Sequence, residues 1–252
     1  MQVPLINALR AELNARDLSP TIVSASDENS YDQARDTWLA LGDNTRANIG
    51  RVNVHGYQEN GQRDQLYTEV SARGHKLWNS EYGESDAGGE RLASNLILDL
   101  RWLHPRVWVY WQALDWAGWG LIDANLQAGT IGVPSQKYFI LAQFSRHIRP
   151  SMQILDGGSD YTVAAYDEGR KKLVIVAVNW SDSGMYINFE LGKFKKPSTD
   201  GAKVLRWVTK TGNASGERYK DYSGDTVVKG QKFWSWFEAK TLQTFEVDDV
   251  LL

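Results

Sequence analysis

The first 150 residues alternate between helical and strand-like hydrophobic patterns, and this alternation restricts the possible folds more than any other feature. Apolar residues at helical spacing predict helices near residues 3–15, 31–41, 62–73, 92–104 and 137–148. Short apolar and β-branched runs predict strands near residues 21–25, 49–55, 75–80 and 107–111. Short strands that alternate with helices are typical of a parallel sheet with covering helices. We therefore expect residues 1–150 to form an α/β domain.

The remaining residues, 151–252, show strand patterns with a period of two. Glycine-containing turns separate the strands, at residues 156–158, 167–169 and 229–230. The strands are predicted near residues 161–165, 173–179, 185–189, 203–208 and 242–247. This pattern favours an antiparallel β-sandwich. We place the domain boundary near Pro150, so that residues 1–150 and 151–252 form separate domains.

The composition argues against several classes of partner and site. The 252-residue chain has a net charge of −3 and a pI near 5.8, which argues against nucleic acid or an anionic membrane as the main partner. It contains no cysteine, so it has no disulfide and no thiolate metal site. No histidine–carboxylate cluster has metal-ligand spacing, so we predict no metal and no other cofactor. No run approaches the roughly 20 apolar residues that span a bilayer, and no signal-peptide pattern follows Met1.

One glutamate stands out as a candidate catalytic residue. Glu81 follows a predicted strand within the segment LWNSEYGE, residues 77–84. A carboxylate at the carboxyl end of a barrel strand can attack the anomeric carbon of a sugar, or stabilise positive charge that develops there. Aromatic and polar residues also end the neighbouring strands, at residues 55–57 and 110–112. The alternative is that Glu81 is a solvated residue at a strand end.

These segments together resemble glycoside hydrolase family 30, and within that family the fungal endo-β-1,6-galactanases. The resemblance rests on residues 53–57, 77–84 and 108–112, and it continues through residues 118–123, 136–150 and 154–158. It covers nearly the whole chain. The family fold is a (β/α)₈ barrel with a side β-sandwich, whereas only four barrel strands can be counted here. The resemblance therefore implies the C-terminal half of a TIM barrel, strands five to eight, followed by the antiparallel β-sandwich.

The resemblance also implies a mechanism and a set of roles. Family members are retaining hydrolases, in which a nucleophile works with a second carboxyl group about 5–5.5 Å away. Glu81 matches the nucleophile. The acid/base glutamate belongs to the fourth barrel strand, which has no counterpart here, so we expect the isolated chain to be inactive. His55 and Tyr57 are expected to orient Glu81 or to hold sugar hydroxyls.

Four further residues are expected to bind substrate. Trp111 would offer a stacking face and Gln112 a hydroxyl partner, although Trp111 could equally belong to the core. Trp116 and Trp119 would line flanking subsites. Flat aromatic rings bind the C–H faces of sugars without requiring charge. The implied substrate is β-linked galactan or a related polysaccharide, bound by a monomeric, extracellular protein.

Several other residues are interpreted as structural. Glu84 is expected to be a supporting or surface carboxylate. Asp27 is expected to cap a helix and Glu28 to be exposed, rather than either acting as a substitute acid. Trp234 and Trp236 are expected to pack against the barrel rather than to bind glycan.

Several alternatives remain open at the level of the sequence. Asn179 and Asn213 stand in N-glycosylation triplets, which matter only if the chain is exported. The chain is interpreted first as an incomplete sequence of a family 30 hydrolase. The alternatives are a non-catalytic carbohydrate-binding protein derived from such a hydrolase, and a gene remnant with no biochemical role. Completion of the barrel by a companion chain is a further hypothesis, which nothing in the sequence demonstrates.

Overall fold

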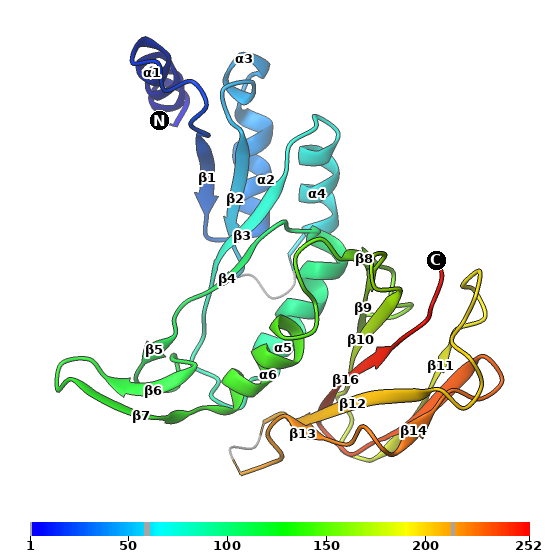
Figure 1. The fold of residues 1–252 in the computed structure, drawn as a ribbon. Helices are drawn as coiled ribbons and strands as arrows, with labels where there is room; N and C mark the ends of the chain where they lie inside the picture. Colours follow the sequence, from blue (N-terminus) through cyan, green and yellow to red (C-terminus); the bar gives the residue numbers. More distant parts are fainter. Residues whose placement is uncertain (1, 58–60, 213–214) are drawn as a thin grey trace. The chain divides into compact units, whose positions relative to one another are not determined.

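The structure, a computed structural model, describes residues 2–57, 61–212 and 215–252 (Figure 1). It divides into two compact units, which we describe separately. Unit 1 comprises Met1–Gly83 and Leu98–Trp111, and unit 2 comprises Glu84–Ile97 and Gln112–Leu252. The boundary near Pro150 stays a prediction.

Unit 1 is an α/β unit with a four-stranded parallel sheet in the order β1-β2-β3-β4. Its elements are α1 (Gln2–Ala15), β1 (Ser24–Glu28), α2 (Tyr31–Ala40), α3 (Asp43–Arg46), β2 (Arg51–His55), α4 (Arg63–Ser71), β3 (Leu77–Tyr82), the π-helical turn η1 (Asp99–Leu103) and β4 (Trp108–Tyr110). The four predicted strands and the helices between them are confirmed. The first strand lies three residues later than expected, because its serines fit the sheet: Ser24 Oγ donates a 2.7 Å hydrogen bond to Asn53 on β2.

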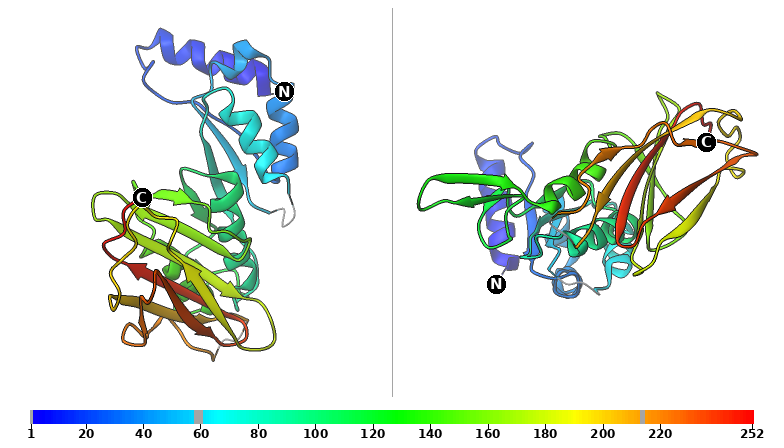
Figure 2. Two further views of the ribbon diagram at one scale, coloured as in Figure 1. Left: turned by 90° about the vertical axis from the view of Figure 1, so that its right-hand side faces the viewer. Right: turned by 90° about the horizontal axis from the view of Figure 1, so that it is seen from below.

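One face of this sheet carries the core of unit 1. Val52, Val54 and Leu77 are buried there with side chains of α2 and α4, such as Trp38 and Leu66. The two helices lie side by side against the strands (Figures 1 and 2). Buried and half-buried residues alternate along β2, as expected for a strand that has one face against a core.

Unit 2 begins with α5 (Glu90–Leu98), whose last residue belongs to unit 1, and continues with a small sheet that the sequence did not predict. This sheet contains β5 (Leu114–Asp115), β6 (Ile122–Asn125) and β7 (Thr130–Pro134). The strands are short and partly exposed, so they lack a clear hydrophobic period. Helix α6 (Gln136–Ser145) follows and contacts β12 and β16 of the sandwich.

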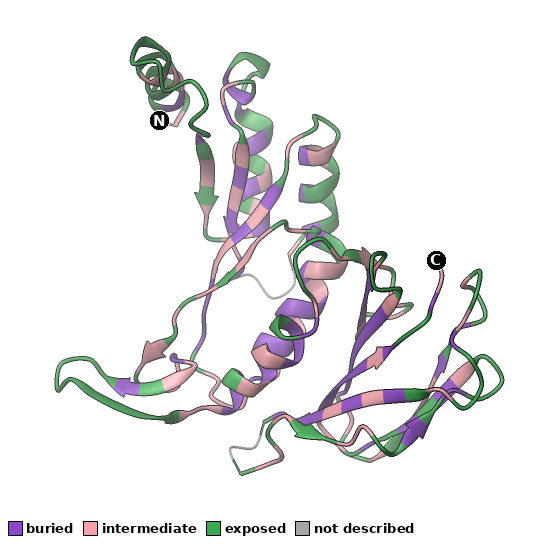
Figure 3. Cartoon of the chain, viewed as in Figure 1, coloured by how far each residue is buried: buried purple, intermediate pink, exposed green. Residues whose placement is uncertain are grey.

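The sandwich consists of a seven-stranded sheet and the two-stranded antiparallel sheet β11-β15. Its strands are β8 (Gln153–Leu155), β9 (Thr162–Asp167), β10 (Lys172–Asn179), β11 (Met185–Glu190), β12 (Lys203–Lys210), β13 (Lys220–Asp221), β14 (Thr226–Val227), β15 (Lys232–Phe237) and β16 (Thr241–Val247). Phenylalanines of both sheets meet in one core, where the rings of Phe189 and Phe233 stack at 4.7 Å and Phe245 lies 5.0 Å from Phe189. Buried residues run along almost all of β10 (Figure 3). The predicted antiparallel strands are confirmed.

Candidate active site

Glu81 and His55 lie in register at the carboxyl ends of β3 and β2. The hydroxyl of Tyr57, just beyond β2, donates a 2.7 Å hydrogen bond to Glu81 Oε1. His55 Nδ1 lies 3.5 Å from the same oxygen. Parallel strands end at one edge of a sheet, which explains why these three side chains meet. Of the predicted site residues, the structure therefore brings together His55, Tyr57 and Glu81.

The ionisation of Tyr57 is affected by this contact. Partial burial, the hydrogen bond to Glu81 and the negative charge of that carboxylate all raise the pKa of the Tyr57 hydroxyl well above its usual value. The hydroxyl therefore keeps its proton and acts as a donor at any ordinary pH. Glu81 itself is partly accessible, with 27% of its side chain exposed.

A second carboxylate, Asp27, joins this group from β1, which corrects the prediction that it caps a helix. Its Oδ1 accepts a 2.6 Å hydrogen bond from Ser80 Oγ and lies 3.4 Å from His55 Nε2. The pairing of β1 with β2 is irregular at Asp27, and such bulges turn a side chain away from its regular direction. The cap of α2 is Ser30 instead, which accepts from the backbone N–H of Gln33. The imidazole of His55 thus lies between two carboxylates.

Glu28 has a structural environment, and the prediction that it is exposed is wrong. It is half-buried, and its Oε1 accepts hydrogen bonds from Gln2 Nε2 at 3.0 Å and from Thr37 Oγ1 at 2.8 Å. These contacts join the end of β1 to helices α1 and α2. Glu28 therefore has a structural role, which is to fix the end of β1.

A buried polar network centred on Asp99 lies behind the site, and the sequence analysis missed it. Asp99 is fully buried, and its carboxylate accepts hydrogen bonds from four side chains. The donors are Arg63 at 2.6 Å, Tyr31 at 2.7 Å, Asn79 at 2.5 Å and Trp108 at 2.8 Å. A buried carboxylate needs such partners, because desolvation of an unpaired charge is costly. The signal in the sequence was an aspartate at helical spacing from the apolar residues Leu92, Leu96 and Leu103.

Gly56 connects this network to the site. A Cβ atom at this position would lie 2.6 Å from Asn79 Nδ2 and 3.0 Å from the Tyr31 hydroxyl, so the close approach requires glycine. Its backbone N–H donates a 2.7 Å hydrogen bond to the carbonyl of Glu81. Because Gly56 lies between His55 and Tyr57, the network fixes the backbone that carries both residues.

Aromatic rings surround the strand ends of unit 1. Tyr82 is buried, with its ring 6.3 Å from Tyr57 and 5.7 Å from Trp108. Trp111, the last predicted site residue of this unit, is 48% exposed, which favours a surface role over the core. Its N–H donates to the carbonyl of Tyr82, and this pairing places it directly after the end of β4.

The other predicted substrate residues belong to unit 2. Gln112 donates a 3.1 Å hydrogen bond to Asp115, and Trp119 is half-buried. Trp116 is 70% exposed. It lines a pocket of about 270 Å³ whose other lining residues are Asp115, Asn125, Leu126 and Gln127. An exposed indole beside carboxylate and amide groups has the chemistry of a sugar-binding pocket.

Glu84 is buried in unit 2 and paired with Lys137. Lys137 is fully buried, and its ammonium donates to the Glu84 carbonyl and lies 3.2 Å from Glu84 Oε1. Burial raises the pKa of the Glu84 carboxyl and lowers the pKa of the Lys137 ammonium. The pair joins the segment after β3 to α6, so Glu84 is a supporting rather than a surface carboxylate.

Other possible sites find little support. Within the ranges described, no group of three His, Cys, Asp or Glu side chains is arranged to hold a metal ion. The helices of the same ranges lack the length and hydropathy of a membrane span. The Asn179 side chain is buried, and its amide nitrogen donates to the carbonyls of Ser183 and Glu238, so a glycan on this nitrogen does not fit the fold. Asn213 lies outside the described residues.

Comparison with known proteins gives consistent relatives, although no family model matches the chain. The chain is 48% identical, over 98% of its length, to an endo-beta-1,6-galactanase of Hypocrea rufa, and the match covers 51% of that protein. Glucuronoxylanase XynC of Bacillus subtilis is 30% identical over 46% of this chain and 26% of its own length.

Solved structures agree on the fold. A glycoside hydrolase family 30 subfamily 8 xylanase, Xyn30A of Clostridium acetobutylicum, has a TM-score of 0.71 at 20% identity, covering 92% of this chain and 57% of its own. GH30 xylanase C of Talaromyces cellulolyticus has a TM-score of 0.70 at 18% identity, and the match covers 96% of this chain and 55% of the xylanase. The chain thus spans about half the length of the endo-beta-1,6-galactanase and of these two xylanases, and the match to XynC covers about a quarter of that protein.

Proposed function

Since this chain belongs to glycoside hydrolase family 30, we propose that it is the nucleophile-bearing part of a retaining glycoside hydrolase, with Glu81 as the nucleophile. The identity to an endo-beta-1,6-galactanase favours β-1,6-linked galactan as the substrate. The single observation that carries the proposal is the environment of Glu81, a carboxylate at a strand end held by Tyr57 and His55.

The contacts of Glu81 suit a nucleophile because they use one oxygen only. Tyr57 and His55 both approach Oε1. Among the described residues, no hydrogen bond or ion pair involves Oε2. A carboxylate fixed through one oxygen can present the other to an anomeric carbon with little loss of conformational freedom.

Tyr57 and His55 would affect the stability of the Glu81 carboxylate relative to its neutral ester. Attack on the sugar turns the carboxylate into a neutral ester, and hydrolysis of that intermediate releases the carboxylate again. The Tyr57 hydroxyl stabilises the carboxylate form, so it favours the second step. Asp27 lies on the other side of His55, with its Oδ1 3.4 Å from Nε2, so the imidazole is placed between the two carboxylates.

The acid/base group is assigned to a part of the enzyme outside this chain. Retaining enzymes need a protonated carboxyl group about 5–5.5 Å from the nucleophile. Asp27 is a poor candidate, because its Oδ1 accepts from Ser80 and faces His55. In this proposal, the four parallel strands of unit 1 are strands five to eight of a (β/α)₈ barrel, and the isolated chain is inactive.

Substrate binding is assigned to the exposed rings and to one amide. Trp111 offers a stacking surface beside the site, and Gln112 offers a hydroxyl partner. Trp116 and Trp119 would line flanking subsites, and the 270 Å³ pocket at Trp116 would hold a sugar unit of the polysaccharide. Extracellular location and a monomeric state are part of the proposal by family resemblance.

The test compares the 252-residue chain with a form extended upstream in its reading frame to the length of its relatives, both assayed on β-1,6-galactan. We expect hydrolysis only by the extended form. Glu81→Gln should reduce its kcat/KM at least about a thousandfold, because no covalent intermediate can form. Glu12→Gln, which changes an exposed glutamate on α1, serves as the matched control.

Three outcomes would overturn the proposal. Full activity of the Glu81→Gln extended form would remove the nucleophile assignment. Hydrolysis by the 252-residue chain would show that the acid/base group lies within it. Absence of activity in the extended form, together with galactan binding by the 252-residue chain, would instead support the non-catalytic carbohydrate-binding protein.

A further inference from the structure

The outer face of the two-stranded sheet β11-β15 carries a row of aromatic and polar side chains. Along β15, Phe233, Ser235 and Phe237 are buried, so the alternate residues point outward. The outward positions pair directly across the two strands: Tyr186 with Trp236, Asn188 with Trp234, and Glu190 with Lys232. The large rings are exposed: Tyr186 to 68%, Trp234 to 51% and Trp236 to 40%. Packing of Trp234 and Trp236 against the barrel stays a prediction; in this structure both rings are exposed.

These rings are held in place rather than loosely attached. Trp236 donates from Nε1 to Glu238 at 2.5 Å, and its ring lies 5.0 Å from that of Tyr186. Gly184 leaves room for the indole, because a Cβ there would lie 2.2 Å from the Trp236 ring. Lys232 Nζ lies 5.7 Å above the ring of Trp234.

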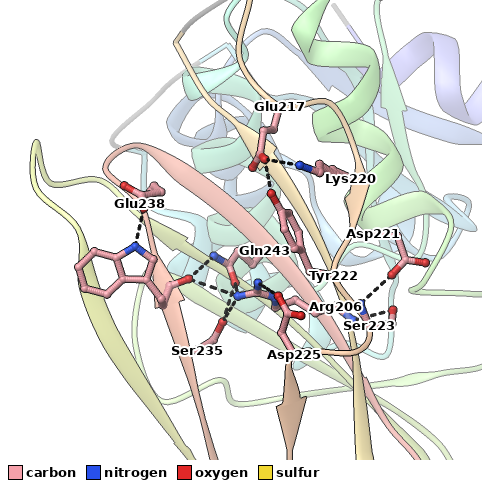
Figure 4. Close-up of polar contacts among 11 residues, drawn as sticks. Arg206, Glu217, Lys220, Asp221, Tyr222, Ser223, Asp225, Ser235, Glu238 and Gln243 are labelled. Atoms are coloured by element: carbon pink, nitrogen blue, oxygen red, sulfur yellow. Dashed lines mark hydrogen bonds and ion pairs between the residues drawn. The ribbon is translucent and has the colours of Figure 1, made fainter.

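The buried side of β15 is also fixed. Ser235 Oγ accepts from Arg206 at 2.8 Å and donates to Gln243 at 2.9 Å, and Arg206 is paired in turn with Asp225 (Figure 4). This network ties β15 to β12 and β16 of the larger sheet. Strand β15, which carries both tryptophans, is therefore fixed to the larger sheet through its buried face.

The charges on this face favour an uncharged partner. Glu190 accepts from Asn188 and lies opposite Lys232, while Glu238 is occupied by Trp236. One lysine and two glutamates give no basic cluster, so phosphate or sulfate groups find no complementary charge. The remaining chemistry is three aromatic rings beside amide, carboxylate and ammonium groups, which matches the apolar C–H faces and hydroxyls of a neutral sugar.

The size of the face also argues against a stable protein partner. Three half-exposed rings, at about 200 Å² for a fully buried ring, offer roughly 300 Å² of aromatic surface. A standard protein–protein interface buries about 800 Å² on each partner. A single polysaccharide strand needs a much smaller footprint.

We propose that Tyr186, Trp234 and Trp236 form a binding surface for a neutral polysaccharide strand. This surface is separate from the group around Glu81 and does not depend on catalysis. Resting on the proposed function, this surface would hold a long polysaccharide on the sandwich while the same polysaccharide is cleaved at the site of Glu81.

The test is affinity electrophoresis of the 252-residue chain in native gels that contain soluble β-1,6-galactan. We expect the wild-type chain to be retarded, and Trp234→Ala to weaken binding about tenfold, the effect of losing roughly 60 Å² of apolar contact. The double variant Trp234→Ala/Trp236→Ala should lose most of its retardation and keep only what the exposed rings of Trp111 and Trp116 contribute. Trp234→Tyr, which keeps a ring, should restore most of it relative to Trp234→Ala.

Matched variants show whether these three rings, rather than any exposed ring or the group around Glu81, hold the polysaccharide. Tyr161→Ala removes a ring of the same unit with similar exposure, at 58%, and should bind normally. Glu81→Gln should also bind normally, since the surface is independent of the site. Thermal unfolding of each variant checks that the fold is intact. Unchanged retardation of a folded double variant, no retardation of the wild type, or a dimer that the double variant dissociates would each overturn the proposal.

Discussion

The site-bearing end of unit 1 and the core of the sandwich are built from different interactions. Behind Glu81, one fully buried carboxylate, Asp99, accepts hydrogen bonds from four side chains of different elements. In the sandwich, four phenylalanines, at positions 189, 233, 237 and 245, pack in one apolar cluster. Hydrogen bonds are directional, whereas apolar packing is not. The difference suggests that position matters more near Glu81 than within the sandwich.

The apolar core and the buried charged network also differ in how each contributes to stability. An apolar core gains free energy with each buried ring and tolerates small shifts. A buried charged network gains little net stability but loses much when one partner is removed. We interpret the buried network of unit 1 as a means of positioning, because a nucleophile must be held within a fraction of an ångström.

The largest expected effect comes from breaking the buried network. Asp99→Ala removes the carboxylate that is paired with the buried Arg63 guanidinium, and should lower the free energy of unfolding by about 3–5 kcal/mol. Urea unfolding followed by circular dichroism measures this change. Asp64→Ala, an exposed aspartate on α4, is the control and should stay within about 0.5 kcal/mol of wild type. A loss under about 1 kcal/mol for Asp99→Ala would show that the network does not stabilise unit 1.

An intermediate effect is expected at Glu246, near the end of the inner strand β16 of the sandwich. Glu246 accepts from His147 at 2.7 Å and from Lys172 at 2.5 Å, and these bonds lower the pKa of its carboxyl to about 2. The folded pKa lies below the unfolded value, so the stabilisation is present above about pH 4.5 and is lost as the pH falls towards 2. Glu246→Gln should lower the free energy of unfolding by about 2 kcal/mol at pH 7, with little difference near pH 2. The free energy of unfolding of both proteins, measured between pH 2 and pH 7, tests this prediction. A difference between wild type and Glu246→Gln that stays constant over this range would contradict it.

A smaller effect is expected inside the apolar core. Phe245→Leu keeps most of the buried area and leaves no polar group unpaired, so we expect a loss of about 1–1.5 kcal/mol. The same urea experiment measures it. If Phe245→Leu were as damaging as Asp99→Ala, the contrast between directional and apolar packing would be lost.

The smallest expected effect on stability comes from the site itself. Tyr57→Phe removes the hydroxyl bonded to Glu81, and should change the free energy of unfolding by less than about 1 kcal/mol because Tyr57 is partly exposed. In the extended, active form we expect kcat/KM to fall about tenfold. Since the pKa of Tyr57 is raised, the wild-type advantage over Tyr57→Phe should persist up to about pH 10. An advantage that disappears below about pH 9 would show that the hydroxyl loses its proton earlier.

Much of the site was predictable because it follows the strand ends. His55, Tyr57 and Glu81 stand where parallel strands stop, and that geometry brings them together. Asp27 was assigned to a helix cap, because its meeting with His55 depends on a bulge in β1, which no hydrophobic period reveals. Asp99 was missed because its partners come from different segments of the chain, and only the fold shows that they converge.

The sequence by itself determined the order of strands and helices, the parallel sheet, the antiparallel strands of the sandwich and the candidate nucleophile. The elements depend on local hydrophobic periods, and Glu81 depends on a short motif at the end of a strand that resembles the family, so a short window contains the information. Only the tertiary structure decided that Asp27 faces His55, that Asp99 closes a buried network, and that Trp234 and Trp236 are exposed. These features depend on pairing register and on which face of a sheet meets solvent, and both are set by residues distant in the sequence.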